Sequence, residues 1–170
     1  MDNIVNETVK ECEREEENCL YTSTTFFYWL KSLRRLRIFF IITPLLLGGF
    51  SGVKILTLSE VDWIKYLVGI SALLAGIIPS IFSALKLDQK IEQVDSAASN
   101  YKIFQGKFRK LKNIDSKTSG FRDKFDQVIE HYEVLKSSSL TPPERFFAKA
   151  KKKIDKGHYD FSVDIKTINK

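Results

Sequence analysis

One apolar stretch, Ile38 to Leu85, constrains this chain more than any other part of its sequence. The residues up to Val53 are all apolar or small, and with the five that follow they reach the length at which a helix crosses about 30 Å of hydrocarbon. The later run, Tyr66 to Leu85, contains no charged residue. We therefore expect a transmembrane hairpin with spans at about 38–58 and 63–85.

A helical hairpin buried in the core of a soluble bundle is the alternative. Soluble core helices usually keep a polar face, however, and seldom stay apolar on every side for two successive runs of about 20 residues. The connecting segment, Ser59 to Asp62, is too short for a domain, so the chain must turn directly back. The expected fold class is an all-α membrane protein, in which a two-helix transmembrane hairpin has long helices that extend into a cytoplasmic helical bundle.

Charge gives the hairpin an expected orientation. The chain has a net charge of +6, although residues 1–30 hold seven acids and two bases. Bases gather at both open ends of the hairpin, whereas only Lys54 and Lys65 lie near its turn. By the positive-inside rule we expect a multi-pass protein of the cell inner (plasma) membrane with both termini cytoplasmic. The bases expected to face cytoplasmic lipid headgroups are Lys31, Arg34, Arg35, Arg37, Lys86 and Lys90.

The segment before the hairpin is expected to be a cytoplasmic amphipathic helix, residues 1–37. Apolar residues between positions 3 and 34 recur at intervals of three and four, with Glu16 and Ser23 as polar interruptions of the same stripe. The aromatic run Phe26 to Trp29 precedes the first span. It would form an aromatic belt at the membrane surface, or it would pack against the helix that returns from the second span.

Two further stripes follow the hairpin. The stripe from Leu87 to Leu111 predicts that the second span and its extension form one helix from about Trp63 to Lys112. A stripe from Phe121 to Leu135 comes after a polar break, and it predicts an antiparallel return helix. Residues 86–138 are therefore expected to form a cytoplasmic helical extension and return helix.

Residues 139–170 are expected to form a basic C-terminal helix and tail. Thr141 can cap the helix, and Pro142 and Pro143 suit its first turn. Aromatic and aliphatic residues then occupy one side and five lysines the other. Such a helix would lie on the inner leaflet, or it would dock on the acidic start of the 1–37 helix.

Small residues recur at helical spacing in both spans, which lets helix backbones approach closely in lipid. They would pack the two spans of one chain, pack spans of different subunits, or line a pore. This expected helix-packing or pore ridge comprises Gly48, Gly52, Ala72, Gly76, Ser80 and Ala84. Pro44 and Pro79 each remove a backbone hydrogen bond, so we expect both spans to be kinked at these positions.

No residue pattern predicts catalysis or a bound cofactor. There is no nucleophile elbow and no glycine-rich phosphate loop, so we do not expect an enzyme. Cys12 and Cys19 lie seven residues apart, and the two histidines are distant in sequence, a pattern unlike a metal site. The thiols are expected to fill space as small apolar groups, with an intermolecular contact or a redox role as the alternative. The basic charge suits anionic lipid, and no direct nucleic-acid binding is expected.

The layout resembles the SLATT domain, a two-span effector module of prokaryotic conflict systems. The resemblance rests on a long helix that ends in Phe26 to Arg37, two closely spaced spans, a helical extension, and the closing segment Thr141 to Gly157. It implies an oligomeric pore-forming or membrane-perturbing effector of a prokaryotic antiphage defence system, whose activation harms the infected cell. These 170 residues do not contain the sensor or nucleotidyltransferase domain of the fused members. A cytoplasmic sensor or nucleotide-signalling partner would then supply the trigger through the cytoplasmic bundle.

Two apolar helices cannot enclose an aqueous channel by themselves, so a pore requires a homo-oligomer in the lipid bilayer. The competing expectation is a membrane-anchored scaffold or adaptor that recruits a partner without forming a pore. The sequence does not separate these two functions.

Overall fold

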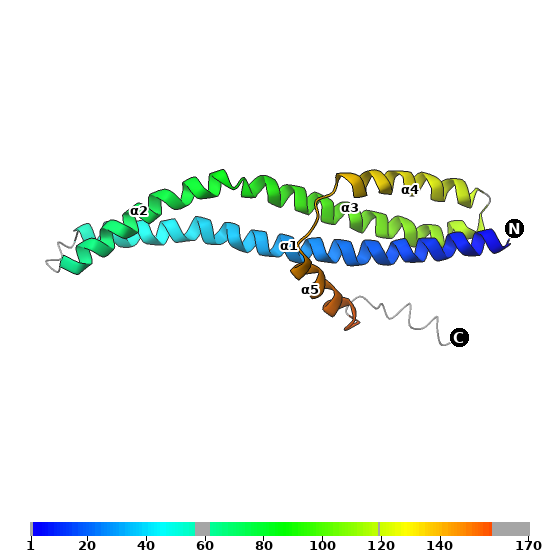
Figure 1. The fold of residues 1–170 in the computed structure, drawn as a ribbon, viewed down its shortest axis with the longest axis horizontal. Helices are drawn as coiled ribbons and strands as arrows, with labels where there is room; N and C mark the ends of the chain where they lie inside the picture. The colour runs from blue at the N-terminus through cyan, green and yellow to red at the C-terminus, as the bar shows by residue number, and fades with distance from the viewer. Residues whose placement is uncertain (1, 57–61, 119, 158–170) are drawn as a thin grey trace. The chain divides into compact units, whose positions relative to one another are not determined.

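The computed structural model describes residues 2–56, 62–118 and 120–157. Within these ranges the chain is helical and has no β-strand, so the all-α expectation is confirmed for them. The elements are α1 (Asp2–Leu56), α2 (Asp62–Ala84), α3 (Leu87–Asn113), the 3₁₀-helix η1 (Asp115–Lys117), α4 (Phe121–Ser138) and α5 (Glu144–Ile154) (Figure 1). Most of the expected turn between the spans and the tail beyond Gly157 lie outside the described residues.

The chain divides into two compact units. One unit, here called the helical unit, combines Met1–Trp29 with Val94–Lys170. The other, the hairpin unit, is Leu30–Gln93. α1 and α3 each contribute residues to both units, and the N-terminal helix and the return helix, far apart in sequence, belong to the same unit.

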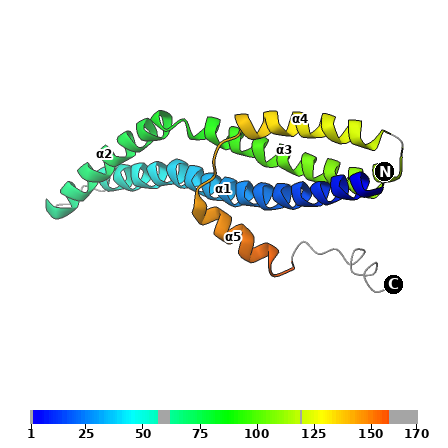
Figure 2. The same cartoon turned by 45° about the vertical axis from the view of Figure 1, so that its right-hand side comes forward.

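In the helical unit, α1 and α3 run in opposite directions. Glu16 of α1 contacts Arg109 of α3, and further along α1 the ring of Phe26 stacks on that of Tyr101, with centroids 5.6 Å apart. α4 lies beside α3 in both views (Figures 1 and 2). The expected antiparallel pairing of α3 with a return helix is therefore present.

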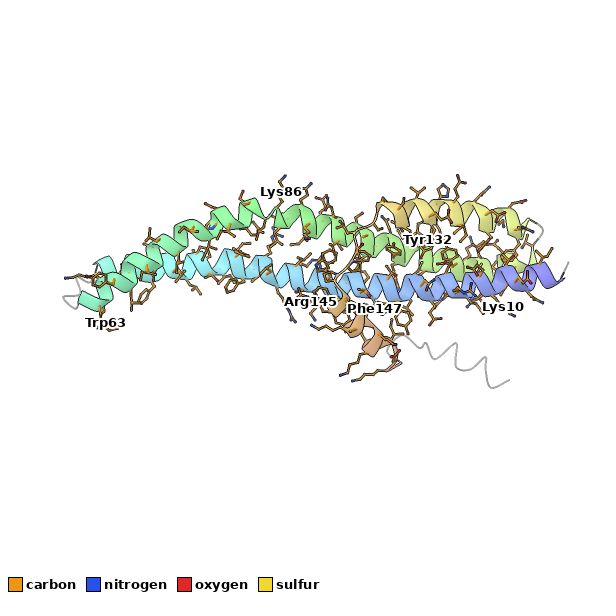
Figure 3. All side chains as sticks on the ribbon, viewed as in Figure 1. Lys10, Trp63, Lys86, Tyr132, Arg145 and Phe147 are labelled. Atoms are coloured by element: carbon orange, nitrogen blue, oxygen red, sulfur yellow. The ribbon has the colours of Figure 1, made fainter. Side chains whose placement is uncertain are left out.

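Aromatic rings form the core of the helical unit. Tyr132 of α4 lies between α4 and α3 (Figure 3), and its ring centroid is 5.3 Å from that of Phe108 and 5.4 Å from that of Phe104. Tyr101 meets Tyr132 edge-on at 6.1 Å. Each such pair contributes about 0.5–1.5 kcal/mol beyond the burial of its area. This core explains why the apolar stripes of three segments join in one unit.

Most residues expected on the inner stripes are buried, and five are half-buried, namely Val5, Val9, Phe125, Val128 and Leu135. The buried stripe residues include Cys12, Cys19, Phe26, Leu87, Ile91, Val94, Ala98, Tyr101, Phe108, Leu111, Phe121 and Tyr132. The polar interruptions Glu16 and Ser23 are also buried. Phe26 and Trp29 pack inside the protein, whereas Phe27 is 42% exposed, so the aromatic run is divided between the core and the surface.

In the hairpin unit, α1 and α2 are antiparallel. The Ser51 hydroxyl lies 2.9 Å from the Leu47 carbonyl oxygen of its own helix and 3.4 Å from the Val68 carbonyl oxygen of α2. Nearer the open end, the rings of Phe40 and Phe82 have centroids 6.0 Å apart. The half-buried face of α2 follows a four-three alternation through Ile64, Val68, Ser71, Ala75, Ile78 and Phe82. This alternation is the spacing of a helix that packs against a single partner helix.

The expectation of one helix from Trp63 to Lys112 is wrong. α2 ends at Ala84 and α3 begins at Leu87, with Lys86 between them at φ 45°. A residue in this left-handed region commonly follows the end of a helix, and it is usually glycine because any other residue has a steric cost there. The turn closes with the Lys86 amide donating to the Ser83 carbonyl at 3.2 Å. The apolar stripe resumes at buried Leu87. Because the spacing of apolar residues continues across the two-residue turn, the sequence pattern did not indicate the helix break.

Candidate functional site

Two helices are long and apolar enough to cross a membrane, and they lie within Ile4–Val53 and Trp63–Ala84. In the most apolar window of each, 6% and 0% of the residues are buried inside the protein. A core helix of a soluble protein is mostly buried, so the alternative of a buried hairpin does not fit these values. Large side chains on both helices are exposed, among them Leu45 at 74% and Leu73 at 67%. An apolar surface of this extent is typical of a membrane or protein contact.

The small residues of the expected ridge lie on the surface of the hairpin unit. Gly48, Gly52, Ala72, Gly76, Ser80 and Ala84 are all exposed. A Cβ atom added at Gly48, Gly52 or Gly76 would meet no other side chain or helix within 4 Å. In this chain the contact between the two helices is made instead by the Ser51 and Phe40 faces of α1 and the half-buried face of α2. The ridge is therefore available to a partner outside the chain.

Both prolines of the expected kinks lie inside helices. Pro44 is within α1 and Pro79 within α2, and each helix continues past its proline. Pro44 is half-buried and Pro79 is exposed. The local bend at each position stays a prediction.

The bases expected to face lipid headgroups are exposed, namely Lys31, Arg34, Arg35, Arg37, Lys86 and Lys90. Arg37 is engaged across the hairpin unit, where its Nε lies 2.9 Å from Oδ1 of Asp88 at the start of α3. Lys86 lies beside a hollow of about 500 Å³ at the α2–α3 turn, lined also by Phe82 and Asp88. Lys86 therefore lies in the turn between α2 and α3, and its side chain is exposed.

Sequence reasoning missed Ser51 as the polar contact between α1 and α2. Its side chain is 4% exposed, and its hydroxyl satisfies the need for a hydrogen bond within an apolar pair of helices. The signal was a lone serine among glycines in the sequence Gly49-Phe-Ser-Gly52. The regular spacing of Gly48 and Gly52 instead predicts that the neighbouring face is the one that packs.

The two thiols lie in the core of the helical unit. Cys12 and Cys19 are fully buried, and Tyr132 forms a side-chain hydrogen bond with Cys19. Burial raises the pKa of each thiol to about 11, because the charged thiolate loses its hydration. Burial and the Cys19 contact likewise raise the pKa of Tyr132. Thiols with raised pKa values are poor nucleophiles and suit a packing role.

No group of three or more His, Cys, Asp and Glu residues could hold a metal ion in the described part of the chain. The polar cluster of the helical unit is an ion-pair network. Nε of Arg109 lies 2.7 Å from Oε1 of Glu16, and Nζ of Lys112 lies 3.0 Å from Oε2. Both carboxylate oxygens of Glu16 are therefore engaged in joining α1 to α3.

The basic helix α5 packs against α1 at a position that follows the acidic N-terminal turns of α1. The rings of Phe147 and Tyr21 have centroids 6.2 Å apart, and the Tyr21 hydroxyl donates to Oδ1 of Asp155 at 3.3 Å. Phe146 and Ala150 are buried. The helix therefore docks on α1 at Tyr21 and its neighbours, and not on the acidic start of α1 that was one of the two expected positions.

No family model matches the sequence, and comparisons with curated proteins and with solved structures gave no match.

Proposed function

We propose that this chain is an inner-membrane protein whose hairpin unit crosses the bilayer, with both termini in the cytoplasm, and that copies of it associate into a membrane-perturbing or pore-forming oligomer. The observation that carries the proposal is the exposure of two apolar helices, whose apolar windows are 6% and 0% buried. Apolar surface of this length is stable in hydrocarbon, where backbone groups are satisfied within each helix.

The exposed ridge on α2 supports association between copies. Ala72, Gly76, Ser80 and Ala84 form a strip of small, exposed residues along α2 that no described residue buries. A Cβ at Gly76 would meet open space. In lipid, small residues at this spacing permit close helix contact and drive association through packing. A second hairpin is the partner that such a strip fits best.

The resemblance to the SLATT domain suggests the cellular process in which such an oligomer would act. Under this proposal the protein is an effector of an antiphage defence system. The helical unit would receive a trigger from a sensor or a nucleotide-signalling partner and rearrange the hairpins so that the membrane leaks. No ionisable residue lies deep in either apolar run, so the pore would discriminate weakly among ions.

The Gly76→Leu/Ser80→Leu double variant tests the ridge. Both positions are exposed, and a Cβ at Gly76 meets nothing, so a single chain has room for the added side chains. A loss of function would then arise from contacts between chains. We expect the association constant in mild detergent to fall about tenfold for each interface, and dye release from vesicles to fall with it.

The matched control is Ile70→Phe/Ile81→Phe, which adds bulk to α2 on an exposed flank away from the ridge. It should leave both association and dye release unchanged. Leakage that persists in the ridge variant, or equal losses in ridge and control variants, would remove the ridge from the mechanism. Expression in cells with and without the genomic neighbours then shows whether a partner supplies the trigger.

A membrane-anchored scaffold is the second candidate function. It is favoured by the division of the chain, because the helical unit has its own aromatic core and could present a docking surface while the hairpin only anchors it. Exposed apolar side chains on that unit include Ile103 at 55% and Val134 at 64%. Replacing residues 38–85 with an unrelated two-span anchor preserves function under the scaffold proposal and abolishes it under the pore proposal.

A further inference from the structure

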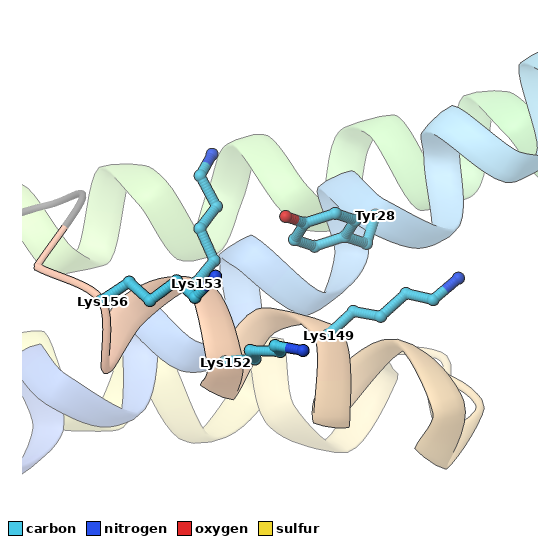
Figure 4. A pocket seen from close by; sticks show the side chains of 5 residues that line it. All are labelled: Tyr28, Lys149, Lys152, Lys153 and Lys156. Carbon is cyan, nitrogen blue, oxygen red and sulfur yellow. The ribbon is translucent and has the colours of Figure 1, made fainter.

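A hollow between α1 and α5, within the helical unit, is lined almost entirely by positive charge. Its volume is about 270 Å³. Four lysines and one tyrosine surround it, namely Tyr28, Lys149, Lys152, Lys153 and Lys156 (Figure 4). Positive charge concentrated around one concave surface attracts anions strongly.

The fold, rather than the lysines, holds these charges together. Phe146 and Ala150 anchor the apolar side of α5, with exposures of 3% and 0%. Asp155 accepts a hydrogen bond from Tyr21 just beyond the helix end. These contacts fix the apolar side of α5 to the unit, and they place the lysines that follow on α5 around the hollow.

Tyr28 forms the wall that faces the lysines. Nζ of Lys153 lies 6.0 Å from the centroid of the Tyr28 ring, within the range of a cation–π contact. The Tyr28 side chain projects from α1 toward the α5 side of the hollow (Figure 4). Its phenol hydroxyl can donate a hydrogen bond to the same anion that the lysines attract.

The segment that carries the lysines has an excess of bases. Residues 144–157 contain six bases and only two acids, Glu144 and Asp155. Neither acid lines the hollow. Asp155 is engaged by Tyr21, and Glu144 lies in the first turn of α5, away from the lysines near the helix end. Residues 144–157 therefore carry a net charge of +4.

We propose that Tyr28, Lys149, Lys152, Lys153 and Lys156 form a binding site for the phosphate group of an anionic ligand. Lysine ammonium groups act as point charges with three donors each, which suits a phosphate that accepts hydrogen bonds from several directions. The headgroup of an anionic lipid and a free phosphorylated molecule carry this same group. The site belongs to the helical unit and goes beyond the proposed function, because it does not depend on whether the hairpin conducts.

Calorimetric titration of the full chain with sodium pyrophosphate tests the site, in an uncharged maltoside detergent at about 0.15 M salt. The site variant is Lys149→Gln/Lys152→Gln, at two exposed positions. The matched control is Lys110→Gln/Lys151→Gln, which removes the same charge from exposed positions of α3 and α5 that do not line the hollow. We expect the dissociation constant to rise about tenfold in the site variant and less than about twofold in the control.

Unchanged helical circular dichroism in both variants would show that they fold. Absence of pyrophosphate binding to the wild-type chain would overturn the proposal. An equal rise of the dissociation constant in the site variant and the control would also overturn the proposal, because the net positive charge of the protein would then account for the binding. The Tyr28→Phe variant should weaken binding by a smaller factor than the site variant, since it removes one neutral donor.

Mixed micelles distinguish the two sources of phosphate. If phosphatidylglycerol weakens pyrophosphate binding more in the wild-type chain than in the site variant, the lipid headgroup competes for the site. The site variant is in micelles of the same charge, so its binding measures how far the negative micelle surface alone repels pyrophosphate. Equal effects of phosphatidylglycerol on both proteins, with the tenfold difference retained, would assign the site to a free phosphorylated ligand.

Discussion

At the scale of single residues, burial decides which chemistry the cysteines can perform. Cys12 and Cys19 occupy stripe positions that an aliphatic residue would suit, and both are fully buried. Their pKa values of about 11 stand two units above the ordinary value of 9.0, chiefly through desolvation. The structure therefore favours the packing role that the sequence predicted over a redox role.

We expect both thiols to resist a thiol reagent at pH 8 and to react fully in urea. A pKa raised by two units lowers the thiolate fraction about a hundredfold, and burial slows access further. A folded-state pKa above the unfolded value gives stability that is complete below pH 9 and is lost as pH rises from about 9 to about 11. Unfolding followed across this pH range measures the loss.

The Cys12→Ala/Cys19→Ala variant is the control for this prediction. It lacks both titrating groups, so its stability should fall less than that of the wild type between pH 9 and 11. A folded protein that is labelled rapidly at pH 8, or an alanine variant with the same alkaline loss, would contradict the prediction.

At the scale of elements, polar contacts specify how helices pair once their apolar faces have met. Glu16 lies in the stripe of α1 where an apolar residue would be expected, and its carboxylate engages Arg109 and Lys112 of α3. The exposed fraction of the Glu16 side chain is only 11%. A buried carboxylate needs such partners, so this pair of contacts fixes the register of α1 against α3.

The Glu16→Ala variant should lower the free energy of unfolding by about 2 kcal/mol. This value lies below the usual 3–5 kcal/mol for a broken buried pair because Arg109 and Lys112 are partly exposed and can be rehydrated. Urea unfolding of the full chain in mild detergent, followed by circular dichroism, measures the change.

Glu11→Ala provides the comparison, because Glu11 pairs with Arg14 on the surface of the same helix. Its removal should cost less than about 0.5 kcal/mol. Similar losses in the Glu11 and Glu16 variants would mean that the pairing of α1 with α3 does not depend on the buried carboxylate.

At the scale of the whole molecule, two kinds of surface occur in one chain. The helical unit buries its apolar stripes in a core of aromatic rings, whereas the hairpin unit leaves most of its apolar residues exposed. A single aqueous environment does not suit both, because exposed apolar area of this extent costs about 25 cal/mol per Å² in water. The proposed arrangement, with a membrane around the hairpin unit and water around the helical unit, would suit both surfaces.

We predict that both termini lie in the cytoplasm. Green fluorescent protein fused to either end should fluoresce, and alkaline phosphatase inserted after Leu58 should be active in the periplasm. Phosphatase activity from the C-terminal fusion would contradict this topology. Loss of an N-terminal segment, seen in the intact mass, would instead identify the first apolar helix as a cleaved signal sequence, which shares its length and composition.

The helical class, the two apolar helices and most of the buried positions could be predicted from the sequence alone. These properties follow from local periodicity, because a helix places residues three and four apart on one side wherever its partner lies. The apolar stripes that end at Leu33, Leu111 and Leu135 could therefore be predicted without knowing which helices pack together.

Which helix faces meet, and where the chain turns between α2 and α3, could not be predicted without the three-dimensional structure. The α2 face that meets α1 runs through Val68 and Ser71, not through Gly76. Both faces of this apolar helix show helical spacing, so which face packs depends on the shape of the partner helix. The turn at Lys86 carries no glycine or proline, so no local signal marked it. The basic hollow likewise exists because packing places α5 against Tyr28, more than a hundred residues away in sequence.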